Sequence, residues 1–214
     1  MVPQSRRVAK YIIKPAMARG LLIALVLVVL VVGGALAWGV SINNQLVVAE
    51  ANVNEKWAQV QNVYQRRADL IPNLVETVKG FATQERTVLE EVTQARASAG
   101  SIKATPELLN DPAAFKKFQD AQNQLGGALS RLLVTVERYP ELKSNQNFLA
   151  LQSQLEGTEN RITVERQRFN EAVRDYNLRV RVFPASFIAA LRGFKEKPFF
   201  ESAPGSENVP KVKF

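Results

Sequence analysis

Residues 148–180 read FLALQSQLEGTENRITVERQRFNEAVRDYNLRV, and their apolar residues recur at helical spacing. Steps of three, four or seven residues return to one face of an α-helix, whereas a half-buried strand alternates in steps of two. The apolar face of this segment consists of Phe148, Leu155, Ile162, Phe169, Val173, Tyr176 and Val180. We therefore predict a long amphipathic helix whose apolar face turns toward a core.

Three earlier stretches of the chain repeat this helical spacing. Their apolar residues are Val53, Trp57, Val60 and Tyr64 in the first, Leu74, Val78, Phe81, Val88 and Val92 in the second, and Phe118, Leu125, Leu129, Leu132 and Val136 in the third. No useful run of alternating β-branched residues lies between them to form a strand. Because amphipathic helices joined by short connections pack antiparallel, we predict an all-α fold with a long antiparallel four-helix bundle.

Prolines mark the ends that we predict for these helices. Pro72 would end the first helix, Pro112 would follow a helix cap at Asp111, and Pro140 would separate the third helix from the fourth. Residues 98–110 form the longest predicted loop. A short helix is expected over residues 185–192, and an extended tail should follow it.

An apolar segment precedes the bundle. Residues 21–40 read LLIALVLVVLVVGGALAWGV and carry no charged side chain. About 20 helical residues match a hydrocarbon core of about 30 Å, so we predict a transmembrane helix from Leu21 to Val40 with Trp38 at the membrane interface. The alternative is a cleaved signal peptide, because Ala-Leu-Ala at residues 35–37 fits a small-x-small cleavage site. The apolar run continues past that site, which favours an uncleaved anchor.

The charges around this segment predict its orientation. Five of the 28 basic residues precede it with no acidic residue among them, and these are Arg6, Arg7, Lys10, Lys14 and Arg19. The positive-inside rule therefore places the N-terminus in the cytoplasm and the helical body outside it. The remaining 23 basic residues stand against 20 acidic ones, a balance that does not indicate a nucleic-acid partner.

We therefore divide the chain into four parts. Residues 1–20 are a basic cytoplasmic segment, and residues 21–40 are the transmembrane helix. Residues 41–182 form the helical bundle, and residues 183–214 form an aromatic and basic tail.

The composition excludes several kinds of catalytic site. The sequence contains no cysteine and no histidine, which rules out disulfides, thiolate catalysis, Ser-His-Asp triads and the usual zinc sites. Carboxylate-bridged metal bundles also need Glu-x-x-His pairs. Acidic residues are nevertheless numerous on the predicted helices, namely Glu85, Glu90, Glu91, Glu156, Glu159 and Glu165. We expect these to be solvated or paired with Arg161, Arg166 and Arg168, and we expect no enzyme activity, catalytic residue, metal or cofactor.

Two groups of charged residues are candidates for interaction. Arg66, Arg67 and Asp69 precede Pro72, where they would either clasp the predicted turn or receive an acidic partner. Glu159 and Arg166 interrupt the apolar row of the last long helix. Such polar positions form either a specificity layer inside the bundle or the seam of a homo-oligomer.

The tail is a third candidate because it interleaves aromatic and basic residues. Its aromatic residues include Phe187, Phe194, Phe199 and Phe200. They would cap the base of the bundle, insert at the membrane interface, or dock onto a neighbouring subunit. Gly33 and Gly34 offer a weaker surface for association through the anchor itself.

Residues 57–96 read WAQVQNVYQRRADLIPNLVETVKGFATQERTVLEEVTQAR and resemble the signature of the LemA family of bacterial membrane proteins. The resemblance continues through YPELK at residues 139–143, NFL at 147–149, LEGTENRITVERQRFNEAVRDYN at 155–177, GFKEKPFFE at 193–201 and VPKVKF at 209–214. It implies one N-terminal membrane helix followed by a long antiparallel four-helix bundle. It implies no enzymatic activity, and it suggests a place among envelope proteins and neighbouring membrane proteases.

From these features we predict a single-pass protein of the bacterial inner membrane that acts as a non-enzymatic scaffold or adaptor of the cell envelope. It would associate with itself, with membrane lipid, and with another envelope protein such as a membrane protease. The alternative is a membrane-shaping or lipid-organising protein that uses the anchor and the aromatic tail.

Overall fold

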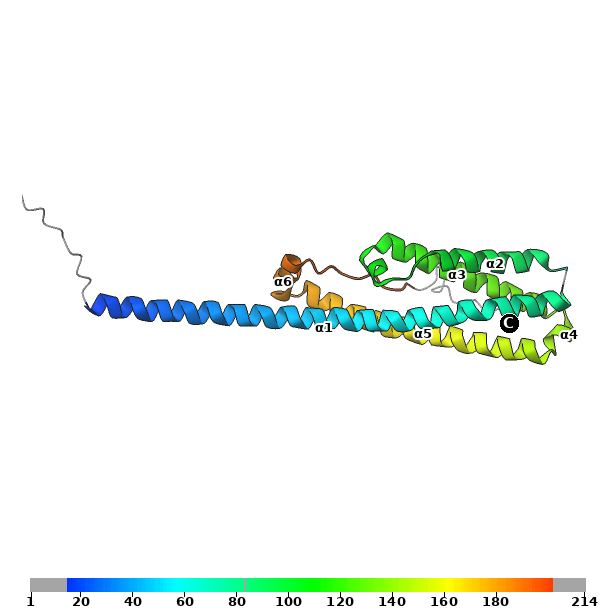
Figure 1. Cartoon of the computed structure of the whole chain (residues 1–214), viewed down its shortest axis with the longest axis horizontal. Coiled ribbons are helices and arrows are strands. Elements are labelled where there is room, and N and C mark those ends of the chain that lie inside the picture. Colours follow the sequence, from blue (N-terminus) through cyan, green and yellow to red (C-terminus); the bar gives the residue numbers. More distant parts are fainter. Residues whose placement is uncertain (1–14, 83, 202–214) are drawn as a thin grey trace, which may run out of the picture. The chain divides into compact units, whose positions relative to one another are not determined.

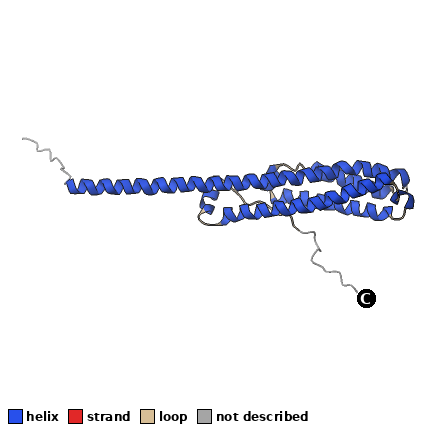
Figure 2. Cartoon of the chain, turned by 90° about the horizontal axis from the view of Figure 1, so that it is seen from below, coloured by secondary structure: helices blue, strands red, loops and turns tan. Residues whose placement is uncertain are grey.

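The computed structural model describes residues 15–82 and 84–201, and all of its regular elements are helical (Figures 1 and 2). These are α1 (Pro15–Phe81), α2 (Arg86–Ser101), the 3-10 helix η1 (Pro106–Asn110), α3 (Pro112–Val136), α4 (Pro140–Lys143), α5 (Gln146–Arg181) and α6 (Ala185–Arg192). The predicted all-α class is confirmed for the described residues. The chain divides into two compact units, Met1–Asn44 and Gln45–Phe214. Four of the five basic residues that precede the apolar segment, and the tail after residue 201, lie outside the described residues.

The described part of the first unit is an apolar stretch of α1. In the described part of the chain, α1 is the one helix long and apolar enough to cross a membrane. Leu21 and Val40 are 74% and 60% exposed, and Trp38 is about half exposed. Apolar side chains with this much exposure suit a hydrocarbon environment better than water. The first unit therefore carries the candidate membrane span.

The second unit contains two apolar clusters, and α1, α3 and α5 contribute to both. One cluster joins Val78 of α1, Leu132 of α3 and Phe148 of α5 with residues of α2. The other is rich in aromatic residues and has Trp57 and Phe169 at its centre. The helices α1, α2, α3 and α5 thus bury apolar stripes against one another, which is the packing expected of a helical bundle.

The predicted break at Pro72 is wrong, because α1 continues through this proline to Phe81. A proline inside a helix removes the N–H that would bond to the carbonyl four residues earlier. Here that carbonyl belongs to Ala68, and it accepts a hydrogen bond of 2.9 Å from Nε of Arg96 on α2. A side chain from the neighbouring helix thus replaces the missing backbone donor, and the chain turns only after Phe81.

Other helix ends follow the predicted signals more closely. The Asp111 side chain accepts hydrogen bonds from the backbone N–H groups of Ala113 and Ala114, and Pro112 takes the first turn of α3. Asn145 caps α5 in the same way. The short helix predicted at 185–192 is present as α6. The predicted loop 98–110 is shorter than expected, because α2 extends to Ser101 and η1 occupies its far end.

Candidate functional site

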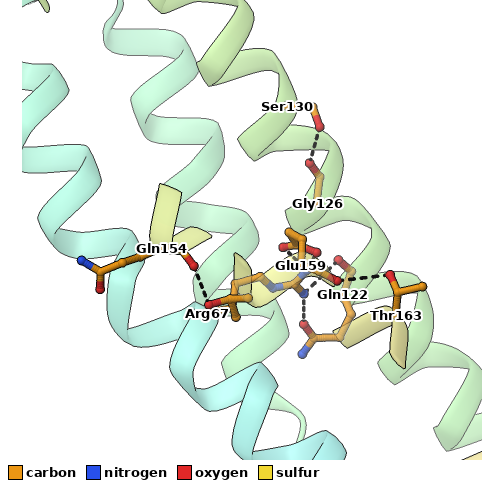
Figure 3. Close-up of polar contacts among 8 residues, drawn as sticks. Arg67, Gln122, Gly126, Ser130, Gln154, Glu159 and Thr163 are labelled. Carbon is orange, nitrogen blue, oxygen red and sulfur yellow. Dashed lines mark hydrogen bonds and ion pairs between the residues drawn. The ribbon is translucent and has the colours of Figure 1, made fainter. Parts of the chain in front are cut away.

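Figure 3 shows the polar contacts of a buried arginine, Arg67, which lies along α1 between Tyr64 of one apolar cluster and Ile71 of the other. Arg67 of α1 is 3% exposed. Its Nη1 donates to both carboxylate oxygens of Glu159 on α5, at 2.9 and 3.2 Å. Its Nη2 donates to the backbone carbonyl of Gln122 on α3 at 3.3 Å and also to the side-chain oxygen of that residue. One guanidinium group therefore ties together α1, α3 and α5.

The side chains of Arg67 and Glu159 differ in their exposure to solvent. The Glu159 side chain is 41% exposed, whereas the Arg67 side chain is 4% exposed. The guanidinium carbon of Arg67 lies 5.1 Å from the ring centroid of Tyr64. Burial raises the pKa of the Tyr64 hydroxyl, and the positive charges of Arg166 and Arg67 partly oppose that rise. The pair therefore combines an enclosed cation with an anion that remains partly solvated.

Figure 3 also separates contacts between helices from contacts within one helix. The Ser130 hydroxyl donates to the Gly126 carbonyl at 3.0 Å, and the Thr163 hydroxyl donates to the Glu159 carbonyl at 3.1 Å. Both contacts lie four residues apart on a single helix. They hold no second helix, so the polar link between the helices in this view is made by Arg67.

Glu156 accepts a hydrogen bond of 2.9 Å from Gln152 on its own helix, and the other four acidic candidates pair with nearby basic residues. These pairs are Glu85 with Arg138 at 3.0 Å, Glu90 with Arg86 at 2.7 Å, Glu91 with Arg131 at 3.1 Å and Glu165 with Arg168 at 2.7 Å. Within residues 15–82 and 84–201, no group of three acidic side chains is arranged to hold a metal ion. The acidic residues thus serve as helix-to-helix and within-helix partners.

Residues 194–201, here named the C-terminal segment, leave α6 and run back along the bundle (Figure 1). The reversal takes place at Gly193, whose φ of 79° lies in the left-handed region that favours glycine. The backbone N–H of Phe194 donates to the Ala189 carbonyl at 3.0 Å, and that of Gly193 donates to the Ala190 carbonyl at 3.3 Å. This pattern is a Schellman motif, which ends the helix and turns the chain.

Three side-chain amides bind the backbone of the C-terminal segment. Asn177 pairs with Lys197, accepting from its N–H at 2.9 Å and donating to its carbonyl at 2.9 Å. Asn170 pairs with Phe200 through the same two contacts, both of 2.9 Å. Gln119 of α3 accepts from the N–H of Glu201 at 3.2 Å and donates to its carbonyl at 2.8 Å. Each amide thus satisfies both backbone groups of one residue.

The spacing of these contacts follows from helix and strand geometry. Asn170 and Asn177 are seven residues apart on α5, which is about 10.5 Å at 1.5 Å per helical residue. Their partners Phe200 and Lys197 are three residues apart, which is about 10 Å in an extended chain. Pro198 favours an extended conformation in the residue before it, so it keeps Lys197 extended. The two asparagines are therefore in register with an antiparallel extended segment.

Lys197 enters a polar pocket and is only 6% exposed. Its Nζ contacts Oε1 of Glu50 on α1 at 2.8 Å and Oδ1 of Asn110 at 2.6 Å. The same atom lies 5.7 Å from the ring centroid of Tyr176. Burial, with a smaller effect from the Glu50 charge, raises the pKa of Tyr176 to about 12. A buried ammonium group needs a counter-ion, and Glu50 supplies it.

Phe200 enters an aromatic pocket three residues later. It is 6% exposed, and its ring centroid lies 4.9 Å from Phe115, 5.5 Å from Phe169 and 6.1 Å from Trp57. The guanidinium carbon of Arg166 lies over the Phe200 ring at 4.6 Å, and its Nη2 donates to the Glu201 carbonyl at 2.9 Å. Buried aromatic clusters of this kind stabilise a fold through both apolar area and ring geometry.

The structure separates the residues that the sequence grouped at Pro72. Arg66 is exposed on α1, and Asp69 accepts a hydrogen bond of 2.7 Å from Gln65 of the same helix. Arg67 faces the bundle interior, so the predicted clasp of a turn is wrong. Glu159 pairs with Arg67 at the edge of the bundle interior, whereas Arg166 lies about two helical turns further on, beside the C-terminal segment.

The aromatic residues of the tail also divide into groups. Phe194 and Phe200 pack on the aromatic cluster of the bundle. Phe199 is 42% exposed and lines a shallow groove of about 670 Å³ with Phe200 and residues of α5. Phe187 of α6 is 68% exposed. One part of the tail thus binds the bundle, and another part stays uncovered.

Sequence reasoning missed the residues that hold the C-terminal segment, which are Glu50, Asn110, Gln119, Asn170 and Asn177. A signal was present in part, because Asn170 and Asn177 are one heptad apart and follow the core residues Phe169 and Tyr176. Polar amides at the edge of an apolar stripe are suited to bind backbone at the rim of a core. Glu50 and Asn110 carried no comparable signal.

The sequence is similar to those of known proteins. The family model described as "LemA family" matches residues 56–214. Two relatives are named magnetosome protein MamQ 1 and MamQ 2 of Paramagnetospirillum magneticum, each 26% identical over 180 residues. A third is magnetosome protein MamQ of Magnetospirillum gryphiswaldense, 27% identical over the same length. These alignments cover 77% of this chain and 66% of each relative, so the chain spans just under two thirds of their length. Since the family match extends over most of the sequence, the chain belongs to the LemA family.

Proposed function

We propose that this chain is a membrane-anchored, non-enzymatic scaffold or adaptor of the bacterial cell envelope that associates with copies of itself. Family membership and the apolar stretch of α1 support association with a membrane. The basic residues before residue 20 support an inner-membrane location with a cytoplasmic N-terminus and the helical unit outside the cytoplasm. A second envelope protein, such as a membrane protease, is a further candidate partner.

An antiparallel four-helix arrangement of α1, α2, α3 and α5 is part of this proposal. The order of core residues supports it for the two helices that extend through both clusters. Along α1 the chain passes from Trp57 to Val78, and along α5 it passes from Phe148, in the cluster of Val78, to Phe169, in the cluster of Trp57. Such a bundle is a stiff support that can present a binding surface at a fixed place.

The binding of the C-terminal segment is the observation that supports a role in protein association. The bundle holds this segment through main-chain contacts to Asn170, Asn177 and Gln119 and through two side-chain pockets. Extended peptides are commonly recognised in this way, with backbone hydrogen bonds giving affinity and pockets giving specificity. Three polar side chains of the bundle, Gln119, Asn170 and Asn177, thus bind extended backbone.

The mass of the full-length protein in mild detergent tests this proposal. We expect a defined multiple of the 23.8 kDa chain. If the association takes place through the helical unit, the Gly33→Leu variant should have the same detergent-extracted mass as the unchanged protein. A Cβ at Gly33 would have no atom within 4 Å, so the substitution would alter the surface of the apolar helix without a clash inside the chain.

Two results would count against the proposal in different ways. A mass equal to one chain would exclude stable self-association and leave a partner protein as the remaining form of the scaffold. A multiple that Gly33→Leu reduces to one chain would move the association from the helical unit to the anchor.

Contact with lipid is a second candidate function, and the exposed face of α6 favours it. Phe187 and Leu191 of α6 are four residues apart and are 68% and 74% exposed, and Phe183, just before the helix, is 82% exposed. Arg179, near the end of α5, lies 3.4 Å from Gln45, the first residue of the second unit. The helix α6 therefore comes directly after the end of α5 that contacts the start of the second unit. Aromatic and basic residues together suit a membrane interface.

Vesicles of anionic lipid test this second function. We expect the reconstituted full-length protein to shield a fluorophore attached at Phe187→Cys from a water-soluble quencher, and the label is specific because the chain has no cysteine of its own. The matched reporter Phe81→Cys lies at the other end of the helical unit, where α1 ends, and should stay accessible. Equal quenching of both reporters would contradict the proposed contact between α6 and lipid.

A further inference from the structure

We propose that the groove that holds the C-terminal segment also binds the same segment of a second copy, so that neighbouring chains exchange it. This inference rests on the proposed self-association and names the surface through which it takes place. The groove consists of Asn170, Asn177, Gln119 and the two pockets for Lys197 and Phe200. Exchange of an identical element is a common route to an oligomer because both states make the same contacts.

The contacts that define the groove involve only residues 197–201 of the segment. Lys197, Phe200 and Glu201 make the six backbone hydrogen bonds with side-chain amides, and the pockets receive Lys197 and Phe200. None of these contacts uses α6 or the covalent path from α5. An extended peptide that arrived from another chain would therefore satisfy the same donors and acceptors.

The connection between α6 and the segment can act as a hinge. Gly193 has a positive φ, and glycine crosses between positive and negative φ at little cost. Lys195 and Glu196 are exposed, and Glu196 contacts Arg181 at 3.4 Å at the surface. Exposed ion pairs of this kind contribute little to stability. Residues 193, 195 and 196 can therefore redirect the segment once Phe194 and Phe200 leave their contacts with the aromatic cluster.

The chemistry of the two pockets favours the segment of a second copy over a peptide from a different protein. The Glu50 pocket takes a cation, the Trp57 pocket takes an aromatic ring, and the asparagines fix a spacing of three residues between them. The proline after Lys197 also pre-organises the extended form. Every copy carries a segment with this combination, and anchoring in one membrane raises the effective concentration of neighbours.

Engineered cysteines can detect exchange because the chain has none of its own. Glu171 of α5 and Phe199 of the C-terminal segment both line the shallow groove of about 670 Å³ described above, which the bound segment forms together with α5. We would co-express two full-length chains with different tags, one with Glu171→Cys and the other with Phe199→Cys. Membranes would be treated with a short bifunctional thiol reagent, and crosslinked pairs that carry both tags would be counted.

Two controls define the background. Leu149→Cys replaces Glu171→Cys at an exposed position of α5 that lies about 33 Å away along the helix, so it reports random collision. A single chain with both Glu171→Cys and Phe199→Cys must react in any state, because its own segment or that of a neighbour brings the thiols together. It therefore shows that the reagent spans the groove.

Exchange predicts that the 171–199 pair links different chains about tenfold more often than the 149–199 pair. Phe200→Ala in the donor chain should remove most of this excess, because the segment loses its aromatic anchor. If the protein assembles but the 171–199 link forms only within single chains, exchange is wrong and another surface mediates assembly. If the detergent-extracted mass is one chain, the proposed self-association fails as well.

Discussion

Arg67 and Glu159 form one ion pair, but their side chains have very different access to water, 4% against 41%. Removing Glu159 leaves a buried cation without its counter-ion, which costs about 3–5 kcal/mol in comparable sites. Removing Arg67 leaves an anion that water can solvate. We therefore expect Glu159→Ala to destabilise the protein by about 3 kcal/mol and Arg67→Met by only about 1 kcal/mol.

Urea unfolding of the full-length protein in detergent measures both free energies. Glu156→Ala serves as the matched control on α5, because Glu156 is exposed and contacts Gln152 on its own helix. Equal losses for the two variants, or a larger loss for Arg67→Met, would show that burial of the cation does not control the stability of the pair.

The sequence predicted one member of the Arg67–Glu159 pair but not the pairing itself. Glu159 interrupts an apolar row at helical spacing, so a polar layer in the last long helix was predictable from period alone. Its partner Arg67 is 92 residues away along the chain, and the pairing depends on how α1 and α5 lie against each other. The local period does distinguish Arg67 from Arg66, because Arg67 lies three residues after Tyr64 and four before Ile71 on the apolar face. The period does not identify Glu159 as its partner.

The helix α1 depends on a contact from another helix at Pro72. The Ala68 carbonyl would lose its donor in Arg96→Ala, because Pro72 has no N–H to offer. An unsatisfied carbonyl at a partly buried position costs about 1–2 kcal/mol. We expect this loss in the free energy of unfolding for Arg96→Ala when Pro72 is present.

A double-mutant cycle isolates the effect. In a Pro72→Ala background the residue at position 72 regains its N–H, which can donate to the Ala68 carbonyl. Arg96→Ala should then cost at least about 1 kcal/mol less than it does beside Pro72. An unchanged cost in both backgrounds would mean that Arg96 stabilises the bundle through some other contact.

The elements were predictable where their signals are local. The helical spacing of the apolar residues predicted the all-α class, and Asp111 with Pro112 predicted the start of α3. The short helix α6 was expected at the residues where it is observed. The end of α1 was not predictable, because proline ends a helix only when nothing else satisfies the freed carbonyl. Here the substitute donor comes from a residue 28 positions later in the chain.

The whole molecule joins an apolar helix to a helical unit that holds its own C-terminal segment. The apolar run and the helical unit followed from hydropathy and period. The groove did not, because its contacts join residues that are between 20 and 87 positions apart, and for Glu50 and Lys197 still further. The spacing of Asn170 and Asn177 by one heptad was the only local signal of the groove that we recognise in the sequence. Its role becomes evident only when the extended segment is seen bound to both asparagines.

Hydrogen–deuterium exchange of the full-length protein tests most directly whether the bundle binds this segment as a peptide ligand. We expect slow exchange at the amides of Lys197, Phe200 and Glu201, since each donates to a side-chain amide. Asn170→Ala should speed exchange at Phe200 by roughly five- to tenfold while α1 stays protected. Exchange at these three amides as fast as in an unstructured peptide would contradict the groove and the proposals that depend on it.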